Sequence, residues 1–252
     1  AVGMGAGRSV TTGVQNTLIG GLAGDALTDA DYNVAIGYAS LTADTLGSKS
    51  TAIGVGTLES QNFTTATDSF NTAVGYTAGL SVTTGTNNTL IGALAGDALT
   101  SAVRNVAVGK GALSSDTLGN ANVAIGEDAL KTQNFTTATN VYNTAVGMNA
   151  GENVTTGVQN TILGGLAGDA LTDADENVAV GFGALTTDTL GSRSVAIGEQ
   201  ALAVQNLTTA TNTYNTAVGF QAGAAVTTGI QNTLSGALAG DALTDADFNT
   251  AL

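Results

Sequence analysis

The chain has 252 residues and a net charge of −14, with six Lys or Arg against twenty Asp or Glu, and it contains no Cys, His, Pro or Trp. The shortage of basic residues argues against a nucleic acid or an anionic membrane as partner, because both are bound by clustered Lys and Arg. Without Cys or His the chain has no disulfide, no imidazole base and no thiol nucleophile, and its apolar runs are too short to cross a bilayer.

The chain repeats itself over its whole length. The string Asn-Thr-Ala-Val-Gly begins at Asn71, Asn143 and Asn215, at intervals of 72 residues. Each 72-residue super-repeat divides into four units of 17, 17, 17 and 21 residues, which in one copy are 71–87, 88–104, 105–121 and 122–142. Such internal repetition is typical of stacked, solenoid-like architectures.

Each unit opens with Asn or Ser, then Thr or Val, usually Ala, usually Val or Ile, and then Gly. This alternation predicts a short strand in which positions two and four, such as Val106 and Val108, share one face. Position five is Gly in all fourteen units, which permits a tight bend or a positive φ. A second Gly at position fifteen, such as Gly85 or Gly119, is expected to mark the return corner.

A 17-residue unit is too short for a helix pair or a propeller blade, but it suits one turn of a parallel β-solenoid. Identical positions would then stack about 4.8 Å apart, and the Asn at position one would form a ladder of side-chain amides. The absence of Pro agrees with this prediction, because every turn must donate backbone hydrogen bonds to its neighbours.

The sequence therefore predicts an all-β chain, a repetitive parallel β-solenoid of about fourteen coils. We expect one continuous solenoid segment of a longer fibre over residues 1–252, with super-repeats of approximately 1–70, 71–142, 143–214 and a partial 215–252.

Rows of small residues at position three are expected on the sides of this roll, as at Ala73, Leu90, Ala107 and Ala124. Flat rows of this kind would let chains approach closely. Self-association is therefore expected, and a cyclic trimer is its simplest closed form.

Residues 71–87, Asn-Thr-Ala-Val-Gly-Tyr-Thr-Ala-Gly-Leu-Ser-Val-Thr-Thr-Gly-Thr-Asn, resemble repeats of phage tail-fibre-like and bacterial surface proteins. Residues 122–126, Asn-Val-Ala-Ile-Gly, are also similar to the head repeats of trimeric autotransporter adhesins of the YadA-like kind. That resemblance implies a left-handed β-roll and a homotrimer. The units here are longer than those of the adhesin heads, and the four-unit super-repeat is an added feature.

The second unit of each super-repeat carries a cluster of carboxylates, which in the first copy is Asp25, Asp29 and Asp31. Alternating acidic residues can hold Ca²⁺, but they can equally form a solvated corner that keeps the solenoid soluble and discourages lateral aggregation. The cluster recurs as Asp169, Asp173 and Asp175 and as Asp241, Asp245 and Asp247, whereas the remaining copy has Asp97, Ser101 and Val103. Because one copy lacks two carboxylates, we assign no metal ligand.

The fourth unit of each super-repeat contains a four-residue insertion within 61–70, 133–142 and 205–214. It is expected to bulge from the roll every fourth turn, about every 19 Å. One interpretation is a ridge that contacts a receptor, glycan or neighbouring fibre. The other is a structural loop whose Phe63 and Phe70 cap the interface between chains.

We expect no enzymatic activity, no catalytic or cofactor-binding residue and no cofactor. The predicted function is the structural shaft of an extracellular fibre, on a virion or a cell surface, that presents or contributes to adhesion and host attachment. The alternative is an adhesin head whose repeated loops bind a host or surface ligand directly. The expected partners are other copies of the chain, as a homotrimer or filament, and possible surface glycans or proteins, without nucleic acid or membrane insertion.

Overall fold

The structure is a parallel β-solenoid in which each sequence unit makes one turn. The computed structural model describes all 252 residues, which form twenty short strands and no helix. About fourteen turns are grouped in two units, residues 1–122 with 134–140, and residues 123–133 with 141–252. The predicted all-β parallel solenoid is therefore confirmed.

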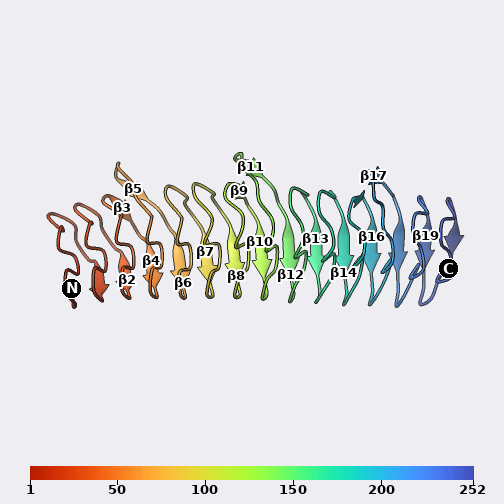
Figure 1. The fold of residues 1–252 in the computed structure, drawn as a ribbon, viewed down its shortest axis with the longest axis horizontal. Coiled ribbons are helices and arrows are strands. Elements are labelled where there is room, and N and C mark those ends of the chain that lie inside the picture. The colour runs from red at the N-terminus through yellow and green to blue at the C-terminus, as the bar shows by residue number, and fades with distance from the viewer. The chain divides into compact units, whose positions relative to one another are not determined.

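One strand at the opening of each sequence unit builds the main sheet of each structural unit (Figure 1). In the first structural unit these strands are β1 Thr17–Ile19, β2 Val34–Ile36, β4 Thr51–Ile53, β6 Thr72–Val74, β7 Thr89–Ile91 and β8 Val106–Val108. In the second they are β10 Val123–Ile125, β12 Thr144–Val146, β13 Thr161–Leu163, β14 Val178–Val180, β16 Val195–Ile197, β18 Thr216–Val218, β19 Thr233–Ser235 and β20 Thr250–Ala251.

Neighbouring strands pair in parallel, with identical repeat positions opposite one another. Strand β6 pairs with β7 so that Thr72 faces Thr89, Ala73 faces Leu90 and Val74 faces Ile91. The same register holds for β13 and β14 in the second unit. The register follows from the constant unit length, because each turn returns the chain to the same place beside its neighbour.

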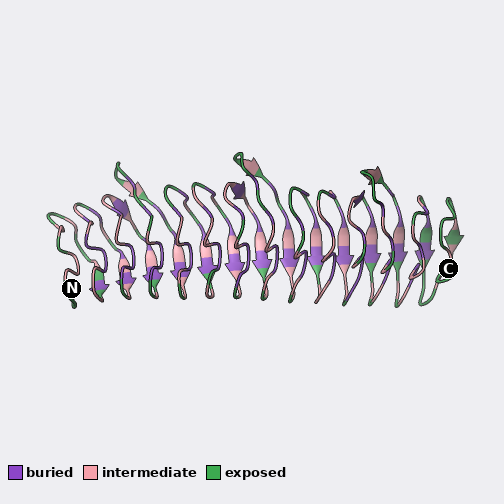
Figure 2. Ribbon diagram, in the orientation of Figure 1, coloured by how far each residue is buried: buried purple, intermediate pink, exposed green.

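The core is thin and is filled mainly by Ala and Leu. The middle residue of each three-residue strand is buried, while its two neighbours point outward (Figure 2). The position-three row of Ala73, Leu90, Ala107 and Ala124 is therefore inside the roll, with no exposed surface. The prediction that this row lies on the sides was wrong. Position three, which is Ala in most turns and Leu or Ile in the second unit of each super-repeat, fills the interior, whereas the Thr or Val at position two and the mostly aliphatic residues at position four point outward.

The glycine at position five lies where neighbouring turns approach closely. Gly92, for example, has a φ of +133°, and a Cβ there would lie 2.5 Å from the carbonyl oxygen of Gly109 in the next turn. Gly85 at position fifteen has a similar role without the positive φ, since its Cβ would lie 2.3 Å from the oxygen of Ala102. Glycine is thus required by the spacing of the turns as well as by the bend.

The 21-residue turns carry a small second sheet at their extra loop. Three two-stranded parallel sheets are formed by β3 Gly47–Ser48 with β5 Thr67–Asp68, β9 Gly119–Asn120 with β11 Thr139–Asn140, and β15 Gly191–Ser192 with β17 Thr211–Asn212. In Figure 1 the segments around β5, β11 and β17 extend beyond the neighbouring loops. The insertion therefore bulges from the roll, as the sequence predicts.

Candidate functional surface

The Asn residues at position one form a buried ladder that joins successive turns. The backbone N–H of Asn88 donates to Oδ1 of Asn71 at 3.0 Å, and Oδ1 of Asn88 accepts from the N–H of Asn105, also at 3.0 Å. Nδ2 of Asn88 donates to the carbonyl oxygen of Ala102 at 2.9 Å. The predicted ladder is present, and its main bonds run from side chain to backbone. Each buried bond contributes about 1 kcal/mol of net stability.

A buried carboxylate supports each inserted loop. Asp188 has no exposed surface, and its Oδ1 accepts from the N–H groups of Gly191 and Leu207, both at 3.0 Å. Its Oδ2 accepts from Nε2 of Gln205 at 2.5 Å, and Oε1 of Gln205 accepts from Nδ2 of Asn215 at 2.8 Å. The loop is therefore tied to the turns on both sides of it.

The same arrangement recurs in the first super-repeat. Asp44 accepts from the N–H groups of Gly47 and Phe63, both at 3.0 Å, and from Nε2 of Gln61 at 2.6 Å. Burial raises the pKa of Asp44 despite these three donors. Asp116 makes the equivalent bonds to the N–H groups of Gly119 and Phe135.

These aspartates are not among the residues singled out from the sequence. A signal for them exists, because an Asp three residues before a Gly and seventeen residues before a Gln recurs every 72 residues, as Asp44, Gly47 and Gln61.

The tips of the inserted loops are exposed and uncharged. Residues 64–66, 136–138 and 208–210 carry the sequence Thr-Thr-Ala and are exposed. Phe63 is buried beneath its own loop, whereas Phe70 is 52% exposed, and the capping of an interface between chains by these two residues stays a prediction. Phe70 therefore does not share the role of Phe63, and instead lies beside Lys49, whose Nζ is 5.2 Å from the ring centroid.

The acidic cluster of the second unit is used in bonds between turns. Oδ1 of Asp29 accepts from the hydroxyl of Thr12 at 2.5 Å, and Oδ1 of Asp31 accepts from the N–H of Val14 at 2.7 Å. Asp25 forms an ion pair with Arg8 at 3.1 Å. Each carboxylate thus binds a different group of a neighbouring turn. Among the 252 described residues, no group of three or more acidic side chains is placed to hold a metal ion.

The copy that lacks two of these carboxylates has different bonds. The N–H of Val103 donates to Oδ1 of Asn120 at 2.8 Å, where the N–H of Asp31 donates to the hydroxyl of Ser48 at 2.9 Å. Oδ1 of Asp97 is buried without a hydrogen-bond partner, and burial raises the pKa of this carboxyl. The solenoid therefore keeps its turns in register with either set of residues.

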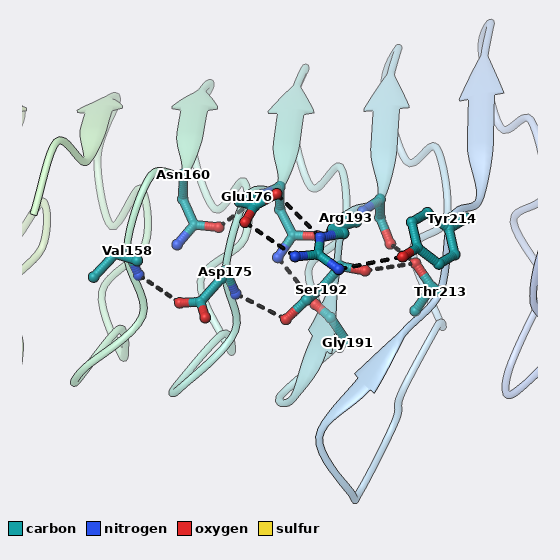
Figure 3. A network of polar contacts seen from close by, with 11 residues as sticks. Val158, Asn160, Asp175, Glu176, Gly191, Ser192, Arg193, Thr213 and Tyr214 are labelled. Atoms are coloured by element: carbon teal, nitrogen blue, oxygen red, sulfur yellow. Dashed lines mark hydrogen bonds and ion pairs between the residues drawn. The ribbon is translucent and has the colours of Figure 1, made fainter.

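An exposed polar network at one corner of the second structural unit joins three successive turns (Figure 3). Arg193 lies between Glu176, with Nε 3.0 Å from Oε2, and Tyr214, with a hydrogen bond of 3.2 Å to the hydroxyl. Because Arg193 is so close, the pKa of Glu176 lies below its usual value. The pair is exposed on both sides, so its contribution to stability is small.

Within each structural unit the outward side chains of the main strands make a continuous surface, which we call the outer face. It consists of the last residue of one sequence unit and positions two, four and six of the next, as in Phe70, Thr72, Val74 and Tyr76. Position two is Thr or Val in every strand, and position four is Ile, Val or Leu in every strand from β1 to β18. The two central rows of the outer face are therefore free of charge.

The structure contains no pocket, and no helix has the length and apolar character of a membrane span. The surfaces that remain for function are the outer face, the inserted loops and the acidic corner. No protein family, curated protein or solved structure matches this chain.

Proposed function

We propose that this chain is a structural segment of an extracellular fibre, such as a phage tail fibre or a bacterial surface filament. Its role is mechanical: stacked turns hold an adhesive or anchoring part of the fibre away from the surface that bears it. Copies of the chain associate along the fibre, and a homotrimer is the simplest closed arrangement.

The observation that supports this proposal is the pattern of bonds between turns. Each turn bonds mainly to the turns beside it, through backbone pairs such as Thr89 N–H to the oxygen of Asn105 at 2.8 Å and through the Asn ladder. In such a repeat protein, stability is roughly the sum of contributions from turns and their contacts. Whole super-repeats can then be added or removed without disturbing the others.

Deleting or duplicating residues 71–142 tests the proposal. Both variants should fold, and the length of the particle measured by electron microscopy should change by four turns, about 19 Å. As a control, deleting residues 71–104 removes two turns and changes the order of the units, so that the 21-residue turns no longer recur every fourth turn. If the variants that lack or duplicate residues 71–142 failed to fold, that result would contradict the modular shaft.

A second candidate is an adhesin that binds its ligand directly, and the projecting loops favour it. Their exposed Thr-Thr-Ala tips at 64–66, 136–138 and 208–210 recur at the same positions of the 21-residue unit. Binding of the folded segment to a glycan array or to matrix proteins, lost when all three tips are changed to Gly-Gly-Ala, would support this function. If the folded segment bound none of these ligands, the result would favour the structural shaft over the adhesin.

A further inference from the structure

The outer face gathers most of the aromatic side chains of the chain and both Met. All five Tyr, both Met and four of the six Phe are exposed and lie in its two marginal rows. The row at the end of the units contains Tyr32, Phe70, Tyr142, Tyr214 and Phe248, and the row at position six contains Met4, Tyr38, Tyr76, Met148, Phe182 and Phe220. The other two Phe are buried beneath inserted loops. Tyr, Phe and Met are the residues enriched at protein interfaces.

The exposed apolar area of this face is large for a free surface. Half-exposed rings contribute roughly 100 Å² each, so the four rings at Tyr32, Tyr38, Phe70 and Tyr76 contribute roughly 400 Å² in the first structural unit alone. The aliphatic row adds to this, since Ile91 is 39% exposed and Ile53 36%. The rings alone thus reach the size of the largest apolar patch of a typical monomer, about 300–600 Å², before the aliphatic row is added, and patches of this size are often functional.

The face also carries a pattern along its length. In four turns, both ends of the outward strand are Tyr, Phe or Met, at 32–38, 70–76, 142–148 and 214–220. The turn that follows each of the last three has Asn or Gln at one end and Gly or Ala at the other. Charged ends occur only in other turns, such as 104–110 and 193–199. Within the second structural unit the aromatic turns 142–148 and 214–220 are four turns apart.

The two margins differ in charge. The end-of-unit row carries Lys49, Arg104 and Arg193 with one Glu, whereas the position-six row carries Glu127 and Glu199 with one Lys. Lys49 and Arg193 already form ion pairs within the chain, and Arg104 is exposed and forms none. One margin is therefore net positive and the other net negative, in a chain that is strongly acidic as a whole.

This difference selects one relative direction for two copies of the chain. When two such faces meet with their solenoid axes parallel, the end-of-unit row of one copy lies opposite the position-six row of the other. When the axes are antiparallel, each row lies opposite itself. Only the parallel arrangement brings the net positive margin against the net negative one: in register it sets Arg193 opposite Glu199 of the other copy, although Arg104 then lies opposite Lys110. The orientation therefore follows from the net charges of the two margins, since complementary potentials set orientation at interfaces.

We propose that copies of this chain associate through the outer face with parallel axes, and that the four-turn pattern of aromatic and charged turns fixes their register. The inference rests on the proposed fibre, because it names the partner that the fibre requires. Slipping one copy by a single turn would place charged ends against aromatic turns, whereas a slip of four turns realigns the aromatic turns 70–76, 142–148 and 214–220 but sets 32–38 against the charged turn 104–110. In β-sheets generally, the register of strands is fixed in a similar way, because a slip moves side chains into the wrong environment.

The first test is the mass of the segment in solution, measured by light scattering over a range of concentrations. The double variant Ile91→Lys with Ile197→Lys places a charge in the central row of each structural unit. The control, Thr84→Lys with Thr155→Lys, adds the same charge at exposed positions outside the outer face. The native segment and the control should be oligomeric. The Ile variant should need a protein concentration about 100-fold higher or more than the native segment to remain associated. Circular dichroism confirms that each variant is folded.

The second test uses the absence of Cys in the native chain. Gln231→Cys and Ala237→Cys place single thiols on the two margins of the same turn. When the two variants are mixed and oxidised, parallel association in register gives the mixed disulfide in excess. With antiparallel axes this last complete turn would lie opposite the first turns of the other copy, so failure to form the mixed disulfide in excess would overturn the orientation.

A native segment that stays monomeric at high concentration would overturn the whole inference, as would an oligomer unaffected by the Ile variant. A folded monomer whose binding to a polysaccharide is lost in the Ile variant would assign the face to a glycan instead. The deletion and duplication of residues 71–142 are read from fold and length, so they test the modular shaft separately from self-association.

Discussion

The strongest prediction concerns two glycines in one turn of the second structural unit. Gly181 and Gly183 both have positive φ, +132° and +61°. A Cβ on Gly181 would lie 2.5 Å from the carbonyl oxygen of Gly198, whereas the first contact of a Cβ on Gly183 is Cγ of Gln200 at 3.8 Å. Changing each to Ala therefore compares a clash between turns with an open position, using the same substitution two residues apart.

The expected costs follow from these contacts. Gly183→Ala should cost about 1 kcal/mol, the lower end of the range for an L-residue in the left-handed region. Thr and Asn already occupy the equivalent positions with φ of 51° and 57°, at Thr77 and Asn149. Gly181→Ala adds a backbone strain of about 1–3 kcal/mol and weakens the bonds Gly181 N–H to Leu163 at 2.8 Å and Gly198 N–H to Val180 at 2.7 Å, each contributing about 1 kcal/mol. The total is roughly 4 kcal/mol.

Urea unfolding at one fixed protein concentration measures both variants, because any association changes apparent stability with concentration. Hydrogen exchange of the Gly198 N–H gives a local measure: it should become faster in Gly181→Ala and remain near the native rate in Gly183→Ala. Equal losses of stability in the two variants would refute the reasoning, since strain from φ alone would then account for both.

Three further changes test the polar interior. Asn160→Ala removes the acceptor of the Asn177 N–H and should cost about 2–4 kcal/mol by urea unfolding, whereas the neighbouring, more exposed Gln159→Ala should cost less than about 0.5 kcal/mol. Asp188→Ala should make the loop at 206–212 sensitive to limited proteolysis, while the exposed Asp173→Ala should not. Because burial raises the pKa of Asp97 above 3.8, the folded state keeps this proton where the unfolded chain has lost it. Its contribution to stability therefore falls as pH rises above 3.8, and Asp97→Asn should remove that fall in urea titrations at successive pH values.

Sequence reasoning was most successful where one residue type recurs at one position. The Gly at position five predicted a bend or a positive φ, and the Asn at position one predicted the ladder; the structure has both, and it adds the close approach of turns at the Gly. The strand positions followed in the same way from alternation, as at Val106 and Val108, which both point outward.

The prediction failed where the pattern allowed two solutions. Positions three and four are both apolar, so alternation separates Ala107 from Val108 without saying which is inside. Which of the two positions points inside depends on the width of the roll, and that width is known only from the folded structure. The support of the inserted loop was missed for a related reason: Asp44 and Gln61 are seventeen residues apart and meet only when two turns stack.

The copies of the super-repeat show what is required at such contacts. At the corner before β4, the N–H of Asp31 finds a hydroxyl at Ser48, and in the next copy the N–H of Val103 finds an amide oxygen at Asn120. Both residues of the pair change between copies, yet the bond between turns remains, at 2.9 and 2.8 Å. What recurs is therefore an acceptor at a fixed place in the stack. A residue that departs from the repeat without changing such a bond, as at the ends of the outward strands, is free to serve contacts outside the chain.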